Sequence, residues 1–298
     1  MEKKERGLYI KSGKVLQAAK KRALILAKPG KSLLELAEQI EKFIESEGGF
    51  PAFPVNLSAN NTAAHFTPSM NDTGVVGESD VLKIDIGVHI DGYITDSALT
   101  VDFSGEHGKM LEAADNALAS ALSVAKNNAN IGKIGEAIES AIKKSGYRPI
   151  VNLTGHGVLQ WTAHAPPGIP NVGRHEERSL EAGFVYAIEP FATDGQGYVR
   201  EGVQAEIFEM NKAFNARSPV ARKVLSHIKE HYRSLPFAQR WVAKKLKLSE
   251  FNQKIAFREL LSKKCLASHP ILNEEHGKTV AQAETTILVE EGKTTVLV

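Results

Sequence analysis

The pattern of apolar and polar residues in the N-terminal part of the chain predicts two helices. The first covers about residues 5–28 and ends at Pro29-Gly30, because proline cannot continue a helix. Ser32 and Glu35 have the spacing of a capping box, which starts a second helix. Gly48-Gly49 ends this second helix.

Residues 81–101 predict a β-hairpin. Two runs rich in apolar and β-branched residues, 81–90 and 93–101, flank the pair Asp91-Gly92. An Asp-Gly pair in this position is a strong signal for a two-residue turn. Such a turn pairs Ile90 with Tyr93, Gly87 with Asp96 and Asp85 with Ala98. His89 shares a face with Asp85, and we interpret it as packing within the hairpin.

The rest of the chain predicts further helices and strands. Helices are expected at about 106–128 and 132–145. Strands are expected near 183–192, 203–210 and 280–290, with 294–298 as a candidate partner of the last one. No internal repeat or low-complexity segment is evident.

Residues 213–270 differ from the rest in composition and look helical throughout. They contain 13 Lys and Arg against three Glu and no Asp, a net charge of +10, whereas the whole chain carries +2. The segment is therefore a candidate inserted helical subdomain with a basic face. The simpler interpretation of that face is a solvated helix surface. The alternative hypothesis is attraction to a polyanion such as ribosomal RNA.

Composition limits the class of protein. The chain has 298 residues, 42% of them hydrophobic, enough for a sizeable core. The single cysteine, Cys265, excludes a disulfide framework within the chain and fits a reducing cytoplasm. The first residues lack the apolar segment of a signal peptide, and no apolar run approaches the ~20 residues of a membrane span. We therefore expect a soluble cytoplasmic protein.

Two aspartates of the predicted hairpin indicate chemistry. Asp85 and Asp96 lie on the same face as diagonal neighbours, roughly 7–8 Å apart at the backbone. Two carboxylates among apolar residues repel each other and are poorly solvated, so a metal ion between them is an economical explanation. The alternative is that Asp96 caps a turn while Asp85 pairs with Lys83 or a distant arginine.

Three further residues extend this set of candidate ligands. His156 lies between Gly155 and Gly157, which leave the backbone free to turn and the imidazole open. Glu189 stands at the end of one apolar strand, and Glu284 at the start of another. Each acid alone could be an edge residue that faces water. Together with the aspartates, they give four carboxylates and one imidazole, ligands suited to two ions of Mn, Fe, Co or Zn.

These residues stand in motifs that resemble those of the methionine aminopeptidases and, more broadly, the pita-bread metallohydrolases. The segment 60–68 is similar to the family segment with an active-site histidine, here His65. Residues 83–96 resemble the segment with the first two metal ligands. Gly155-His156-Gly157, Ile188-Glu189-Pro190 and Gln282-Ala283-Glu284 match the other three in the family's order. The resemblance implies an α+β fold with a curved antiparallel sheet backed by helices.

The resemblance also implies a subtype and a domain organisation. The interval from Glu189 to Glu284 is long, as in type 2 enzymes, which carry a helical insertion there. A long charged N-terminal extension is absent, as in archaeal enzymes. We expect a catalytic domain of residues 1–212 and 271–298, with 213–270 as the inserted basic subdomain.

Residue roles follow from the resemblance. Two divalent ions (Co, Mn, Fe or Zn) are expected on Asp85, Asp96, His156, Glu189 and Glu284. Glu189 would also shuttle protons, His164 would stabilise the oxyanion, and His65 would hydrogen-bond the scissile amide nitrogen or the leaving amine. Phe53 would pack on the substrate's methionine side chain. The implied activity is removal of the N-terminal methionine from nascent chains with a small second residue, by a monomer that does not bind membranes.

Two rival functions remain. One is an Xaa-Pro aminopeptidase of the same fold, which would share the ligands and differ in its substrate pocket. The other is a non-catalytic pita-bread protein that binds RNA or a protein partner through the basic segment; such a protein would not need all five ligands.

Overall fold

The computed structural model describes residues 1–211 and 216–298. These residues form seven helices: α1 (Lys3–Leu26), α2 (Leu33–Ser46), α3 (Gly108–Val124), α4 (Ile131–Lys144), α5 (Pro219–His231), α6 (Gln239–Leu246) and α7 (Glu250–Ser262). The strands are β1 (Phe50–Pro51), β2 (Asn56–Ala59), β3 (Thr62–Ala64), β4 (Val81–Ile90), β5 (Tyr93–Asp102), β6 (Arg148–Pro149), β7 (Thr154–Leu159), β8 (Thr162–Pro170), β9 (Val185–Ile188), β10 (Phe191–Thr193), β11 (Arg200–Glu201), β12 (Ile207–Met210), β13 (Phe237–Ala238), β14 (Leu266–His269), β15 (Leu272–Asn273), β16 (Val280–Gln282), β17 (Thr285–Glu290) and β18 (Lys293–Val296).

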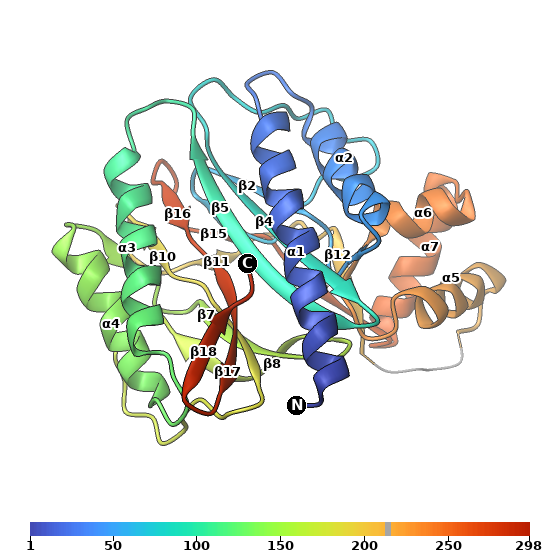
Figure 1. Cartoon of the computed structure of the whole chain (residues 1–298). Coiled ribbons are helices and arrows are strands. Elements are labelled where there is room, and N and C mark those ends of the chain that lie inside the picture. The colour runs from blue at the N-terminus through green and yellow to red at the C-terminus, as the bar shows by residue number, and fades with distance from the viewer. Residues whose placement is uncertain (212–215) are drawn as a thin grey trace.

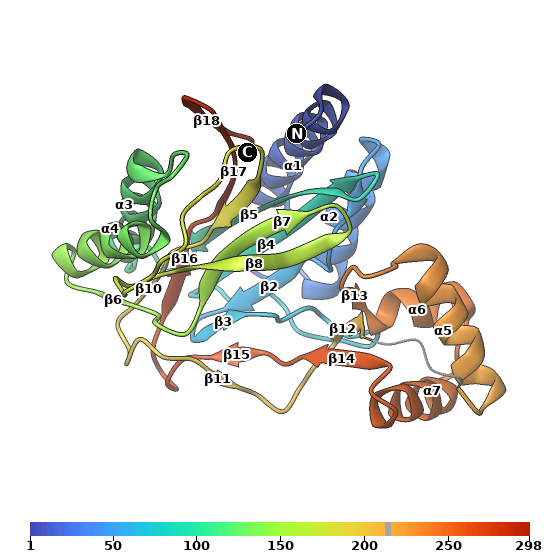
Figure 2. The ribbon, with the colours of Figure 1, turned by 90° about the horizontal axis from the view of Figure 1, so that it is seen from below.

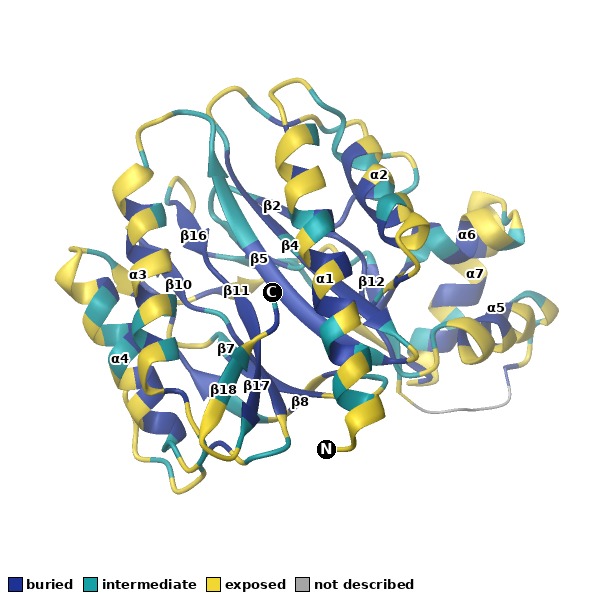
Figure 3. Cartoon of the chain, in the orientation of Figure 1, coloured by how far each residue is buried: buried dark blue, intermediate teal, exposed yellow. Residues whose placement is uncertain are grey.

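Four helices lie on one side of the strands, and α5–α7 lie at one end of the molecule (Figures 1 and 2). Helices α1 and α2 share one buried apolar cluster with the β4–β5 hairpin, around Leu16 and Ile40. Helices α3 and α4 share a second cluster with β9 and β17, around Ile138. Figure 3 shows that the strands beneath the helices are largely buried. The α+β fold predicted from the sequence is confirmed.

The predicted hairpin forms with the expected register. Ile90 pairs with Tyr93, Gly87 with Asp96, and Asp85 with Ala98. Asp91 and Gly92 form the turn, both with positive φ, 53° and 81°, as a type I′ turn requires. On its other edge β4 pairs with β2 and β1, so the hairpin is held inside a four-stranded sheet.

A five-stranded sheet, in the order β18-β17-β9-β7-β8, lies beside this hairpin. The sequence does not predict its strands β7 and β8, because this stretch has several glycines and prolines and no clear alternation. Strand β9 pairs with both β7 and β17, which brings the segments around His156, Glu189 and Glu284 together. The predicted pairing of the C-terminal segment with the last strand is present as β17–β18.

We call residues 216–270 the helical insert. Its three helices enclose a buried cluster of their own that includes Phe257 and Cys265. The prediction of helix throughout this segment is wrong at two places. Residues 237–238 form β13 and residues 266–269 form β14, and both strands pair with β12. The expected domain boundary at 212/213 lies outside the described residues.

None of the described helices combines the length and the apolar character that a membrane span needs.

Candidate metal centre

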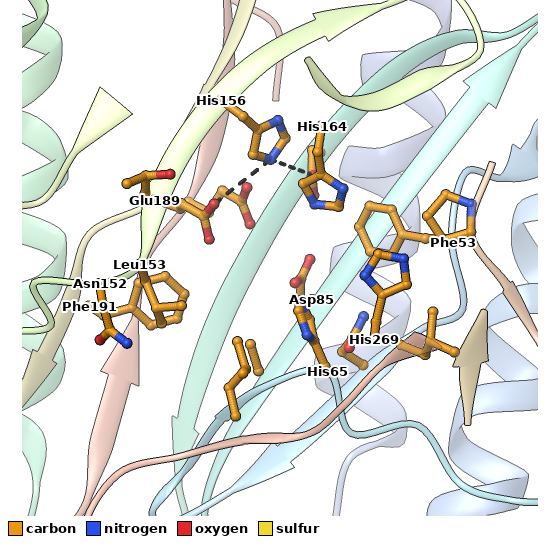
Figure 4. Close-up of a pocket in the computed structure, with 18 residues that line it drawn as sticks. Phe53, His65, Asp85, Asn152, Leu153, His156, His164, Glu189, Phe191 and His269 are labelled. Carbon is orange, nitrogen blue, oxygen red and sulfur yellow. Dashed lines mark ion pairs between the residues drawn. The ribbon is translucent and has the colours of Figure 1, made fainter. Parts of the chain in front are cut away.

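A cavity of about 200 Å³, open to solvent, lies at the junction of the hairpin and the five-stranded sheet. Its lining contains all eight residues proposed from the sequence as ligands, catalytic groups or pocket residues: Phe53, His65, Asp85, Asp96, His156, His164, Glu189 and Glu284. Figure 4 shows the labelled members of this set around one space. The structure thus brings together side chains that are far apart in the sequence.

Three of these side chains are close enough to share one ion. Asp96, His156 and Glu284 each offer a ligand atom, all within 4.8 Å of one another, and all three residues are buried. His156 Nε2 lies 3.6 Å from Asp96 Oδ2 and 3.8 Å from Glu189 Oε1. Asp85 lies diagonally beside Asp96 in the hairpin, where Asp85 pairs with Ala98 and Asp96 pairs with Gly87. The five proposed ligands therefore form one continuous group.

The imidazole of His156 is oriented by its own strand. Its Nδ1 lies 3.1 Å from the carbonyl oxygen of Gly157, so Nδ1–H donates to that carbonyl. The lone pair of Nε2 then faces the carboxylates, which is the arrangement found in metal-binding histidines. Burial lowers the pKa of His156 to about 4, so the ring is neutral at pH 7.

The four carboxyl groups are crowded and poorly solvated. Burial raises the pKa of Asp85 to about 7 and those of Asp96, Glu189 and Glu284 well above their ordinary values. Repulsion between neighbouring carboxylates adds to the shift for the last three. Asp85 Oδ1 and Asp96 Oδ1 are buried and have no hydrogen-bond partner within the part of the chain that the structure describes. Orphaned anionic oxygens of this kind fit a divalent cation, which would compensate their charge.

The alternative partner considered for Asp85 is engaged elsewhere. Lys83 is fully buried, but its Nζ donates to the carbonyl oxygen of Asn60 at 2.7 Å and to that of Val81 at 3.3 Å. No ion pair between Asp85 and a Lys or Arg occurs among residues 1–211 and 216–298. The ion-pair explanation for Asp85 is therefore wrong.

Side-chain hydrogen bonds hold the strands that carry the proposed ligands in place. Thr286 Oγ1 accepts from Asp96 N–H and donates to Asp96 O, both at 2.7 Å. Ser97 Oγ donates to the carbonyl oxygen of Glu284 at 2.5 Å. Gln282 Nε2 donates to Glu284 Oε2 at 3.4 Å, which fixes that carboxylate from behind. These contacts tie β5 to the β16–β17 segment, so the carboxylates on both keep their relative positions.

Three glycines in the site allow neighbouring groups to lie where a side chain would otherwise be. A side chain on Gly87 would meet the Phe53 ring at 2.2 Å, and one on Gly155 would meet the carbonyl oxygen of Ala187 at 2.4 Å. Gly157 is similarly close to the carbonyl oxygen of Pro166, at 2.7 Å. The prediction that glycines flank His156 to let the chain turn is wrong, because both lie within strand β7.

Two more histidines face the cavity. His65 Nδ1 lies 3.1 Å from the carbonyl oxygen of Pro270, and burial, assisted by His269, lowers the His65 pKa to about 4. The ring of His164 lies 4.5 Å from that of His156. The side chain of His164 is exposed to the open cavity. Protein atoms nevertheless surround the ring on its other sides, and the resulting loss of solvation lowers the His164 pKa well below its ordinary value. Both rings are therefore neutral at pH 7.

The cavity also contains a histidine that the sequence did not suggest. His269 lines it beside His65, with ring centroids 5.8 Å apart. Its Nε2 lies 3.3 Å from Glu209 Oε2, across the β12–β14 pair. His269 lies at the end of a segment predicted to be helical, so its place in the site depended on an unpredicted strand.

A buried group of carboxylates and one imidazole at the edge of an open cavity is typical of metal-dependent hydrolases. The sequence profile described as Metallopeptidase family M24 matches residues 8–213. The chain belongs to this family.

Individual proteins resemble the chain over nearly its whole length. A methionine aminopeptidase of Pyrococcus horikoshii is 46% identical, covering 96% of this chain and 97% of its own. One from Archaeoglobus fulgidus is 42% identical and covers 99% of each chain. Among solved structures, a thermophilic Arx1 has a TM-score of 0.88 with 17% identity, covering 100% of this chain and 91% of its own. This last likeness concerns the fold alone.

Proposed function

We propose that this chain is a methionine aminopeptidase that uses two divalent ions to remove the N-terminal methionine from newly made proteins. The observation that carries the proposal is the cavity in which four carboxylates and His156 face the apolar ring of Phe53. The methionine aminopeptidases that resemble the chain along its whole length support the same activity.

Asp85, Asp96, His156, Glu189 and Glu284 would hold the ions, which we expect to be Co, Mn, Fe or Zn. When bound, such ions activate water at neutral pH and take up the free amine of the substrate. The protein supplies a buried, negatively charged group of ligands whose charge requires compensation. Gln282 and Thr286 keep these ligands in position.

Three residues would handle protons and the peptide. Glu189, whose pKa is well above normal because of burial, can accept a proton and pass it to the leaving amine. His164 is neutral, and its ring N–H can donate to the oxygen that becomes negative during attack. His65 donates through Nδ1 to Pro270, so its Nε2 can accept the N–H of the scissile amide.

Phe53 would bind the methionine side chain. Its ring is buried against Gly87 yet contributes to the cavity lining. Burial of a methionine side chain contributes about 1.5–3 kcal/mol. Since this pocket opens directly beside the carboxylates, a substrate anchored there places its first peptide bond at the proposed metal site.

The activity can be tested with two peptides. The protein is stripped with chelator, reloaded with Co, Mn, Fe or Zn, and given Met-Ala-Ser and Ala-Pro-Gly in parallel. We expect methionine release from the first peptide alone, lost by at least about 100-fold in Asp96→Asn because one oxygen ligand is replaced.

Each other outcome favours a rival function. Cleavage of the proline peptide alone would make the chain an Xaa-Pro aminopeptidase. Absence of cleavage with every metal, in folded protein that binds metal, would favour a non-catalytic protein.

The helical insert supports a second proposal, about partners. Twelve of the thirteen Lys and Arg in residues 213–270 are exposed; Arg240 is the exception. We propose that residues 213–270 form an inserted unit beside a catalytic domain of 1–212 and 271–298, and that its basic surface binds ribosomal RNA. Sedimentation with ribosomes at rising salt tests this, and binding that is absent or independent of salt would contradict it. A monomeric state and a cytoplasmic location remain predictions.

A further inference from the structure

Arg240 differs from every other basic residue of the helical insert, because its side chain is 1% exposed. It lies near the start of α6 and points out of the insert. Its Nη1 donates to Thr67 Oγ1 at 2.7 Å and to the carbonyl oxygen of Pro68 at 3.1 Å. Its Nη2 forms an ion pair with Glu41 of α2. One guanidinium thus reaches two other parts of the fold at once.

Glu41 and Thr67 extend these contacts. Glu41 is 7% exposed and accepts from Trp241 Nε1 at 2.9 Å and from Val55 N–H at 3.3 Å. Thr67 Oγ1 donates to the carbonyl oxygen of Val55 at 2.9 Å. We call Glu41, Val55, Thr67, Arg240 and Trp241 the Arg240 network. Every contact in it is a directional hydrogen bond or an ion pair between buried or half-buried groups.

Two members of the Arg240 network are close neighbours along the chain of residues that line the cavity. Val55 stands between Phe53 and Asn56, both of which line it, and Thr67 follows His65 by two residues. His65 has a φ of 67°, in the left-handed region. A residue other than glycine keeps such a conformation only where its surroundings hold it. The preceding strand β3 pairs with β15. On the other side of His65, Phe66 O accepts from Leu57 N–H of β2 at 2.7 Å, and Thr67 Oγ1 accepts from Arg240.

We propose that Arg240 is a positioning residue for the proposed reaction: through Thr67 and Val55 it holds His65 and Phe53 in place around the substrate. Through Arg240, the helical insert then keeps the lining of the cavity in position, and the ion pair with Glu41 holds the guanidinium in place. The proposal rests on the proposed function of the site.

Arginine is suited to this task, whereas lysine is not. Its planar fork donates to Glu41 and to the 67–68 segment at the same time, with fixed geometry. A lysine ammonium could keep the charge pair with Glu41, but its single nitrogen cannot span both partners. Loss of the whole side chain would leave Glu41 buried and unpaired, which endangers folding. The informative changes are therefore the milder ones.

Arg240→Lys keeps the charge, and Thr67→Val removes only the hydroxyl that links Arg240 to Val55. The matched control is Lys244→Met, which removes the exposed ion pair with Glu38 between the same two helices, α6 and α2. Each protein is examined for thermal unfolding, metal uptake, kcat and KM on Met-Ala-Ser, and the ring NMR signals of His65, assigned with His65→Gln.

We expect Arg240→Lys and Thr67→Val to fold and take up metal, but to lose about 10-fold in kcat/KM, mainly through KM, because the substrate is less well positioned. The His65 signals should shift in both variants, even without metal. Lys244→Met should change neither property.

The proposal is overturned if both variants fold with unchanged His65 signals and unchanged kcat/KM, since Arg240 would then serve stability alone. Failure of the proposed function looks different. The wild-type protein would release no methionine, while the His65 signals would still report whether Arg240 positions that ring.

Discussion

Two histidines of the site are oriented by the same kind of hydrogen bond to a backbone carbonyl, although their proposed roles differ. In His156 and in His65, Nδ1–H donates to a carbonyl oxygen at 3.1 Å, of Gly157 and of Pro270 respectively. Each ring therefore presents the lone pair of Nε2. For His156 that lone pair faces carboxylates and suits a metal ion; for His65 we expect it to accept an amide N–H. The neighbours, more than the imidazoles themselves, decide the proposed role.

The absence of a side chain on Gly87 makes room for Phe53. We predict that Gly87→Ala pushes the Phe53 ring, because the new Cβ would lie 2.2 Å from it. Overpacking of this kind costs about 1–3 kcal/mol. Displacement of the ring should raise KM for methionine peptides several-fold, about 3- to 10-fold, with a smaller change in kcat. Steady-state kinetics and thermal unfolding measure the two effects.

Gly108→Ala is a suitable control for this variant. Gly108 is the first residue of α3, and a Cβ there would meet nothing within 4 Å. This change should leave KM unaltered and leave stability unchanged or slightly higher. An unaltered KM in Gly87→Ala would mean that the Phe53 ring does not contact the substrate's side chain.

At the scale of residues, local context carried much of the information. The hairpin aspartates could be placed side by side because strand periodicity and one turn determine their relation. The position of His269 could not be predicted in this way. It depends on the pairing of Ile207 with His269, 62 positions further along the chain, and on Glu209 across the same pair. No pattern within the segment signals such a long-range pairing.

The hairpin is also the element that the sequence described best. Its register was predictable because Asp91-Gly92 determines the turn and both strands have strong β propensity. Strands β7 and β8 lack these signals. They are joined through Gln160 and Trp161, with Trp161 at a φ of 62°, and the glycines and prolines in them are typical of loops. Their strand character comes from pairing with β9, so it was visible only in the folded chain.

The hairpin turn contains a pH-sensitive contact. Gly92 N–H donates to His89 Nδ1 at 3.2 Å, so His89 must be neutral there. Burial lowers the His89 pKa from 6.5 to about 4, with Arg233 lowering it further and Asp91 opposing this. Between these two pH values the unfolded chain binds more protons than the folded chain. The contribution of His89 to stability is therefore complete above about pH 6.5 and decreases as the pH falls towards 4.

We predict that His89→Asn removes this part of the pH dependence, because asparagine can accept from Gly92 but cannot be protonated. Between pH 7 and pH 5, the wild type should lose about 2 kcal/mol more unfolding free energy than the variant. Denaturant unfolding of both proteins at the two pH values gives the difference. Equal losses would show that His89 keeps its ordinary pKa in the folded protein.

For the whole molecule, the proposed metal site would link metal binding to stability. Without ions, the four crowded carboxyl groups must be protonated or repel one another. We predict that chelation lowers the thermal unfolding temperature and that added Mn or Co restores it. An ion at 100 times its Kd contributes about 2.7 kcal/mol. Calorimetry with and without chelator measures this.

Asp96→Asn is the comparison for the chelation experiment. This variant lacks one of the three carboxylate or imidazole ligands that cluster within 4.8 Å. Its unfolding temperature should respond much less to chelator and to added metal. An equal response in both proteins would place the stabilising ion elsewhere.

The separate character of the helical insert was visible at the scale of composition, because basic residues are concentrated in 213–270. Composition does not predict the two short strands of the insert. Residues 266–269 pair with β12, which leads into the insert, and this pairing closes its base. Composition therefore shows where a segment differs from the rest of the chain. The strand pairing that joins the segment to the fold depends on residues outside the segment.

One buried atom offers a built-in reporter of motion. The Sγ of Cys265 belongs to the only cysteine of the sequence, and that residue is 0% exposed inside the core of the helical insert. A thiol reagent can reach it only when this core opens. The rate of labelling in native buffer therefore measures the opening of the insert without any engineered probe. Substrate or ribosomes that hold the insert closed would slow the labelling, so one unmodified protein can report on both.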